Sequence, residues 1–170
     1  MVNNANVGDS PDIPTKFIEL LEKVRDPEIP ALSVLDMGVV RKVEQTDSGF
    51  IITITPTYSG CPAMDTIEED ILHQFRAHGL ENAAVKTVLY PAWTTDWFSD
   101  EAKEKLRKTG IAPPDSSMSK ADLMGTDTTA ACPRCRSKDT SRISEFGSTA
   151  CKALYKCHDC GDPFDYFKCI

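Results

Sequence analysis

Two cysteine pairs near the C-terminal end of the sequence restrict the possible folds more than any other feature. Cys132 and Cys135 form one C-x2-C pair, Cys157 and Cys160 form another, and 21 residues separate the pairs. A C-x2-C turn presents two thiolates to one side of an ion, and two such turns complete the tetrahedral coordination that Zn²⁺ adopts. The pattern therefore predicts a zinc ribbon over residues 131–170.

A module of about forty residues rarely builds a sufficient hydrophobic core, so its metal would supply much of the free energy of folding. Its predicted strands are residues 141–147, 150–156 and 163–168. Two alternatives stay open: iron in a rubredoxin-like site, which uses the same four thiolates, and four unrelated core cysteines. The remaining thiols of this region, Cys151 and Cys169, are either small buried side chains or a secondary thiol pair.

The charge of the chain is unevenly distributed. The formal net charge of the 170 residues is −7, but residues 131–170 carry an excess of two positive charges. The acidic remainder repels phosphate backbones, which argues against nucleic acid as a partner. No run approaches the roughly 18 apolar residues of a membrane helix, and the first residues lack the features of a signal peptide. We therefore expect a soluble, cytoplasmic protein with reduced thiols and no membrane partner.

The first part of the sequence mixes helical and strand-like patterns, which predicts an α+β domain with a small sheet. The expected elements are a helix at 14–26, strands at 39–45 and 50–57, a helix at 62–77, a strand at 83–90 and a helix at 99–110. The first two strands should form an antiparallel hairpin. The predicted organisation is a disordered N-terminus at 1–13, a domain at 14–114, a linker at 115–130 and the ribbon at 131–170.

One cysteine, Cys61, stands apart from the others, between Gly60 and Pro62, where a predicted strand gives way to a helix. The amide groups and dipole of a helix N-terminus stabilise a thiolate, which can bind a soft metal, carry an iron–sulfur cluster or act as a nucleophile. Nucleophilic catalysis needs a positioned base, and His73 and His78 lie too far along the same helix. Metal or cluster handling is favoured, with an inert buried cysteine as the alternative.

Three acidic residues upstream, Asp26, Glu28 and Asp36, are candidate supporting ligands, because carboxylates can assist iron binding. Acids in such positions also cap turns, and that role alone can account for Asp26. The chain contains no dinucleotide-binding glycine motif, no P-loop and no paired ExxH iron site. We therefore expect a protein without catalytic residues of its own.

The stretches "DPEIPALSVLDMGVV" and "TPTYSGCPAMD" resemble the metal–sulfur cluster assembly (SufT-like) family. Adding "YPAWTTDWF", "CPRC", "EFGSTACKALYKC" and "PFDYFKC", the chain resembles the PaaD (PaaJ) family of bacterial phenylacetate degradation. The resemblance implies a small α/β sandwich of the cluster-assembly type followed by a C-terminal zinc ribbon. It also carries a cluster- or iron-transfer role over to Cys61, and matches Asp26, Glu28 and Asp36 to the family pattern.

What this resemblance implies about function is more specific than any spacing argument. Members of the PaaD family are encoded with the multicomponent phenylacetyl-CoA epoxidase, a di-iron oxygenase with a reductase that uses NADPH, FAD and an iron–sulfur cluster. The expected role is an accessory protein that assembles or repairs an iron or iron–sulfur centre, with the oxygenase and reductase subunits as partners. The expected metals are resident zinc and transient iron or an iron–sulfur cluster. A non-catalytic structural subunit of the epoxidase is the alternative, and a homodimer is left open.

Overall fold

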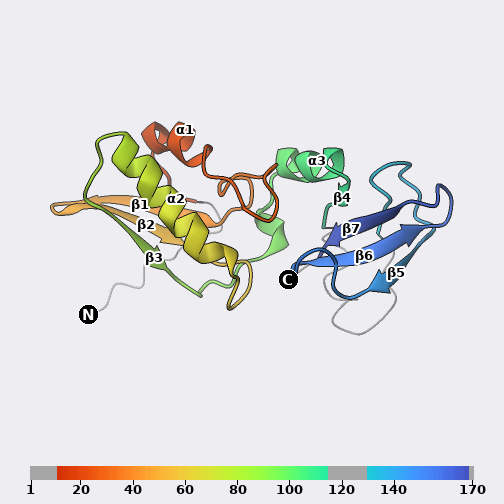
Figure 1. The fold of residues 1–170 in the computed structure, drawn as a ribbon. Helices are drawn as coiled ribbons and strands as arrows, with labels where there is room; N and C mark the ends of the chain where they lie inside the picture. Colours follow the sequence, from red (N-terminus) through yellow and green to blue (C-terminus); the bar gives the residue numbers. More distant parts are fainter. Residues whose placement is uncertain (1–10, 115–129, 169–170) are drawn as a thin grey trace. The chain divides into compact units, whose positions relative to one another are not determined.

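The computed structural model describes residues 11–114 and 130–168, which form two compact units. The units divide between Trp93 and Thr94, and each contains its own β-sheet (Figure 1). Residues 94–112 therefore group with the cysteine-rich part of the chain, whereas the sequence analysis placed them in the first domain. The reason is a short strand near residue 111, which adds to the sheet of the second unit.

The sheet of the first unit has three strands in the order β1-β2-β3. Strands β1 (Val40–Thr46) and β2 (Gly49–Ile54) form the predicted antiparallel hairpin, and β3 (Ala83–Thr87) pairs in parallel with β2. Gly49 has φ +143°, and a Cβ atom there would lie 1.8 Å from the carbonyl oxygen of Asn82. Only glycine therefore fits where the hairpin turn passes the start of β3.

Helix α2 (Ala63–Ala77) provides the crossover from β2 to the parallel strand β3 and lies across one face of the sheet (Figure 1). Its buried side chains recur every four residues and include three of the predicted apolar positions, Ile67, Ile71 and Phe75, together with Ala63. The ring of Phe75 stacks on Phe17 at 5.4 Å, and Phe17 contacts Phe50 of β2 edge-on at 5.5 Å. These three rings join the first helical segment, α2 and the sheet.

The first helix is shorter than predicted. The 3₁₀ turn η1 (Thr15–Phe17) leads into α1 (Ile18–Leu21), so the helical segment ends five residues before the predicted end at 26. Beyond it, backbone hydrogen bonds go to a following loop: Val34 N–H donates to Val24 O at 3.0 Å, and Asp26 N–H donates to Leu32 O at 3.0 Å. Val24 follows the apolar spacing of the helix and is buried, but it lies beyond the helix end at Leu21.

Part of the segment predicted to be disordered joins the first sheet. Asp12 forms a parallel bridge with Lys42, its N–H donates to Arg41 O at 2.9 Å, and its carbonyl accepts from Val43 N–H at 3.0 Å. The prediction for residues 1–10 lies outside the described residues.

The second unit contains a four-stranded sheet in the order β4-β7-β6-β5. The three predicted ribbon strands are present as β5 (Thr140–Ser144), β6 (Lys152–Cys157) and β7 (Pro163–Phe167), which pair in antiparallel fashion. Strand β4 (Ile111–Ala112) pairs in parallel with β7 and was not predicted, because two residues are too short to show an alternating pattern.

A helical segment precedes β4 in this unit. The 3₁₀ turn η2 (Thr95–Trp97) leads to α3 (Asp100–Lys108), which begins after Ser99 as predicted, with the Ser99 hydroxyl accepting from Ala102 N–H at 3.0 Å. Phe98 contacts Phe167 of β7 at a centroid distance of 5.2 Å. A cluster of buried residues forms the ribbon core: Ala112, Ala130, Cys132, Ala153, Tyr155, Cys157, Phe164 and Tyr166.

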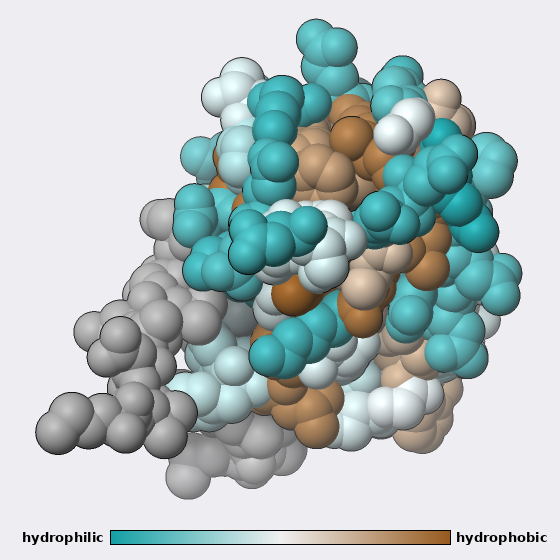
Figure 2. All heavy atoms as spheres, turned by 90° about the vertical axis from the view of Figure 1, so that its left-hand side faces the viewer, coloured by the Kyte–Doolittle hydropathy of each residue, from teal (hydrophilic) through white to brown (hydrophobic). Residues whose placement is uncertain are grey.

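Ala130 was assigned to the linker at 115–130 but belongs to this core, and residues 115–129 lie outside the described ones. Within the described ranges, no helix combines the length and hydrophobicity needed to cross a bilayer. Seen from the left of Figure 1, the surface carries mainly hydrophilic side chains, with hydrophobic areas interrupted by them (Figure 2). That distribution agrees with a sequence in which 26% of residues are charged.

Candidate functional site

The two cysteine pairs meet in the second unit, as the spacing predicts. All four sulfur atoms lie within 4.8 Å of one another. The Sγ atoms of Cys132 and Cys160 are 3.7 Å apart, and those of Cys135 and Cys157 are 3.5 Å apart. Four thiolates at about 2.3 Å from a tetrahedral zinc ion stand roughly 3.8 Å from one another. The arrangement therefore fits a metal ion held by four sulfurs.

Two tight turns hold these cysteines. In the first turn, Arg136 N–H donates to Cys132 O at 2.9 Å, and Cys132 N–H donates to Ser137 O at 2.9 Å. In the second, Gly161 N–H donates to Cys157 O at 3.1 Å, and the φ of Gly161 is +77°. Each turn points its two sulfurs to one side, so that the turns face each other across the site.

One cysteine of each pair is buried and the other is exposed. Cys132 and Cys157 belong to the ribbon core, whereas Cys135 and Cys160 lie at the surface. A metal ion held by all four would thus tie the core to the two turns. Loss of that ion would remove a link that few other contacts of so small a module can replace.

Their surroundings shift the pKa values of Cys157 and Cys135 in opposite directions. The sulfur of Cys157 accepts a hydrogen bond from the backbone N–H of Cys160, and the thiols of Cys135 and Cys160 also bond to it. Together these bonds lower the pKa of Cys157 to about 7, although burial acts in the opposite direction. This sulfur is thus readily available as a thiolate near neutral pH. The N–H of Ser137 lowers the pKa of Cys135, but desolvation and the neighbouring thiols raise it to about 12. A cation at the centre would reverse such a rise, since metal binding displaces the thiol protons.

Of the two extra thiols of this region, Cys151 is described, and it does not belong to the four-cysteine cluster. Cys151 is buried, and its Sγ lies 3.1 Å from Thr149 Oγ1. This placement suits a small buried side chain. Cys169 lies outside the described residues, so the predicted secondary thiol pair stays a prediction.

Cys61 occupies the turn that precedes α2, two residues before the helix begins at Ala63. Its N–H donates to Tyr58 O at 3.3 Å, its carbonyl accepts from Met64 N–H at 3.3 Å, and its side chain is half-buried. Gly60 has φ +81°, and no atom lies within 4 Å of the position that a Cβ would take there. The backbone beside the thiol is therefore open to an approaching molecule.

The three candidate acids are placed mainly by local hydrogen bonds. Asp26 is buried, and its Oδ1 accepts from Glu28 N–H at 2.8 Å and Ile29 N–H at 2.7 Å. Asp36 Oδ2 accepts from Ser33 N–H at 2.9 Å, and the Ser33 hydroxyl accepts from Asp36 N–H at 3.0 Å. Glu28 is half-buried. These contacts give Asp26 and Asp36 the turn-capping role that the sequence analysis kept as an alternative.

The described residues place no complete set of metal ligands around Cys61. In residues 11–114 and 130–168, the four ribbon cysteines are the one group of three or more His, Cys, Asp or Glu side chains placed to hold an ion. Neither Cys61 nor the three acids belong to such a group. A metal ion at Cys61 would thus need ligands beyond those that the described residues bring together there.

Replacement of Asp26 tests its structural role. Asp26→Ala leaves two buried amide groups without their acceptor, and we expect it to lower the free energy of unfolding by about 2–3 kcal/mol. Asp26→Asn keeps an oxygen acceptor and should cost clearly less. Urea denaturation followed by circular dichroism measures both variants. Equal losses in the two would show that the charge of Asp26, rather than its capping geometry, matters.

Sequence reasoning missed an ion pair that links the two cysteine turns. Arg134 Nη1 lies 2.6 Å from Asp162 Oδ2, although 28 residues separate the pair in the chain. Because of this separation, no local pattern predicts the ion pair. The sequence offered one indication, since two C-x2-C turns that bind the same metal ion also bring the residues beside their cysteines close together. The buried hydroxyl of Thr55, which has no hydrogen-bond partner in the described residues, was likewise unforeseen.

Comparison with known proteins finds a family for each unit. Residues 16–88 match the family described as "Iron-sulfur cluster assembly protein", and residues 116–168 match "PaaD zinc beta ribbon domain". A crystal structure titled "Domain of Unknown Function DUF59 from Bacillus anthracis" is similar with a TM-score of 0.50 and 30% identity. It covers 54% of this chain and 88% of that chain. The predicted cluster-assembly fold and C-terminal ribbon are thus confirmed.

Two curated relatives extend the comparison. A protein of Porphyromonas gingivalis (strain ATCC BAA-308 / W83), named "Fe-S protein maturation auxiliary factor", is 34% identical over 92 residues, which cover 53% of this chain and 87% of that protein. An Escherichia coli (strain K12) protein is named as a putative subunit of 1,2-phenylacetyl-CoA epoxidase. It is 50% identical over 151 residues, covering 89% of this chain and 90% of that protein. The chain therefore belongs to the PaaD family, in which a cluster-assembly domain precedes a zinc ribbon.

Proposed function

We propose that this protein is a cytoplasmic accessory factor of a multicomponent phenylacetyl-CoA epoxidase and assists the assembly or repair of its iron or iron–sulfur centres. The observation that carries the proposal is the half-buried thiol of Cys61, beside open backbone at Gly60. Its membership in the PaaD family and its likeness to a named Fe–S maturation factor support the same role. The clients would be the oxygenase and reductase components.

A single thiol suits transfer better than storage. Cys61 as a thiolate would give one ligand to the iron or cluster, while the donor or the client gives the others. Transfer is then an exchange of ligands, in which the client's side chains replace Cys61 without a change in the oxidation state of the metal. A complete cage would hold the cargo too tightly to release it. In the described residues Cys61 belongs to no group of three or more potential ligands, which supports this division of labour.

The cysteine-rich unit would hold resident zinc and recognise the client. Four sulfur ligands within 4.8 Å of one another suit zinc, which needs no open coordination position in a structural site. The zinc supplies rigidity and no reaction step. With its geometry fixed in this way, the ribbon can present a constant surface to the epoxidase components.

Replacing Cys61 with serine tests the transfer role. Cys61→Ser removes the soft ligand but little volume, so the fold and the ribbon metal should stay unchanged. We expect the iron content of the co-expressed oxygenase, and the epoxidase activity of the cells, to fall several-fold. Elemental analysis of anaerobically purified components measures the first, and product formation measures the second.

Cys151→Ser is the matched control, because Cys151 is also a cysteine outside the four-cysteine cluster. It should leave iron content and activity at the wild-type values. Normal iron content and activity in the Cys61 variant would contradict the transfer role.

The name of the Escherichia coli relative, which calls it part of an epoxidase, favours a second candidate: a structural component of that complex. Affinity purification separates the two functions. A structural component should co-purify in a fixed ratio to the oxygenase, whether or not the iron centres are complete. A maturation factor should co-purify mainly with iron-depleted enzyme and be lost on iron loading.

A further inference from the structure

The second unit contains a pocket of about 380 Å³, where the end of α3 meets the first cysteine turn and the start of β7. Arg107, Lys108 and Arg134 provide its positive charges, and Pro133 and Phe164 provide apolar wall. A volume in this range suits a small organic molecule, since ligand pockets commonly measure about 300–1,000 Å³. The pocket exists because the α3–β4 segment packs with the ribbon.

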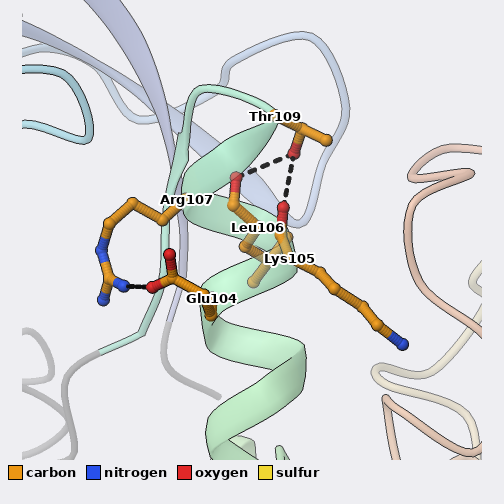
Figure 3. A network of polar contacts seen from close by, with 5 residues as sticks. All are labelled: Glu104, Lys105, Leu106, Arg107 and Thr109. Carbon is orange, nitrogen blue, oxygen red and sulfur yellow. Dashed lines mark hydrogen bonds and ion pairs between the residues drawn. The ribbon is translucent and has the colours of Figure 1, made fainter.

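The end of α3 is held firmly at this pocket. Thr109 Oγ1 donates to Leu106 O at 2.8 Å and to Lys105 O at 3.3 Å (Figure 3). The Thr109 N–H donates to the same two carbonyl groups, at 3.0 Å and 3.2 Å, so that backbone and side chain together close this helix end. Gly110, with φ +82°, then turns the chain toward β4. Arg107 and Lys108 are thus displayed from a fixed helix end rather than from a loose loop.

The two cations from α3 are available to an anion. Lys108 is exposed and forms no ion pair with any residue of the described ranges. Arg107 pairs with Glu104, but the two side chains are 30% and 44% exposed. A pair so open to water contributes little stability, so that an incoming anion can compete for the guanidinium.

Arg134 has a different role. Its guanidinium pairs with Asp162, the one acidic residue that lines the pocket. It also lies near the metal centre, where four thiolates exceed the charge of a divalent ion by two. We therefore assign Arg134 to neutralising these negative groups. Arg107 and Lys108, which belong to α3 and not to a cysteine turn, are assigned to the recognition of a ligand.

We infer that this pocket binds a phosphate-bearing small molecule, whose phosphate contacts Arg107 and Lys108 and whose organic part contacts the wall at Pro133 and Phe164. A guanidinium offers a planar fork of donors and an ammonium offers a point charge, and together they match the several oxygens of a phosphate. The volume leaves room for an organic part of about nucleoside size. The inference concerns the second unit and does not depend on Cys61.

Calorimetric titration of the metal-loaded full-length protein tests the inference with three probes that lack a thiol. These are adenosine 3′,5′-bisphosphate, inorganic pyrophosphate and adenosine. We expect the bisphosphate to bind at one site, pyrophosphate to compete with it, and adenosine alone not to bind. Lys108→Gln should weaken phosphate binding by about three- to tenfold, because it removes one charge-assisted hydrogen bond.

Lys105→Gln is the matched control. It removes the same charge from the same last turn of α3, but Lys105 extends to the opposite side of the helix from Arg107 (Figure 3). Its affinity for the bisphosphate should equal that of the wild type. Tighter binding of the bisphosphate than of pyrophosphate would support the contact of an organic part with Pro133 and Phe164. Equal binding would support the phosphate site at Arg107 and Lys108 but overturn the apolar contact.

Two results would overturn the inference. One is the lack of saturable binding of either phosphate probe at millimolar concentration, with the metal content of the protein unchanged throughout. The other is an equal loss of affinity in the Lys108 and Lys105 variants, which would assign the binding to the general charge of α3. Metal analysis after each titration shows whether a probe has removed the ion rather than filled the pocket.

Discussion

Replacing Cys132 with serine is expected to abolish metal binding at the ribbon and to unfold the second unit. A structural zinc site contributes about 10–16 kcal/mol in small zinc-dependent modules, which exceeds what a core of this size supplies. Cys132 is also buried in that core, so its loss removes a ligand and a packed side chain together. Metal analysis and circular dichroism of the purified variant measure both effects.

Cys151→Ser again provides the control, because Cys151 is buried in the same unit but lies outside the cluster. It should keep one metal ion per chain and a folded ribbon. A Cys132 variant that kept both its metal and its ribbon structure would disprove coordination by four sulfurs.

Phe75→Ala should produce the largest loss of stability in the first unit. Phe75 is fully buried on α2 and stacks on Phe17, and Phe50 of β2 completes the ring cluster. Truncation of a buried phenylalanine costs about 3–5 kcal/mol, through lost burial and the cavity that remains. This loss is a large part of the roughly 5–15 kcal/mol by which domains are stable. Urea denaturation monitored by circular dichroism should show the shift.

Leu72→Ala on the same helix is the comparison, because Leu72 is only half-buried and should cost far less. The ribbon offers an internal check, since all four metal ligands belong to the other unit. The Phe75 variant should keep its metal, whereas the Cys132 variant should keep the first unit folded. Metal loss from the Phe75 variant would show that the units do not fold independently.

Much of this architecture is predictable from local patterns. The C-x2-C spacing identified the four-sulfur cluster, because two short turns admit few arrangements of their sulfurs. The period of apolar residues in α2 identified that helix, and the β-branched run of β2 identified the hairpin, whereas the parallel pairing of β3 was not predicted. The position of Cys61 before α2 followed from the same boundary, since Pro62 favours the start of a helix.

The errors came where tertiary contacts decide a local conformation. Val24 continues the apolar pattern of the first helix, yet the backbone there bonds to the loop that ends near Val34. Ile111 and Ala112 become a strand only because β7 accepts them as a neighbour. For Asp26 the sequence left two roles open: its Oδ1 accepts from the amide groups of Glu28 and Ile29, which is the turn-capping role, and a ligand role stays a prediction. No sequence pattern distinguishes a carboxylate that caps a turn from one that awaits iron.

The parallel strand β4 also protects the ribbon against self-association. It covers the outer side of β7, whose N–H and C=O groups would otherwise form an exposed edge. A strand with such an edge readily recruits a strand from another molecule and seeds aggregates. A fragment starting at residue 116, where the ribbon family match begins, would lack this cover. The α3–β4 segment and the ribbon should therefore be kept together whenever a fragment of this protein is engineered.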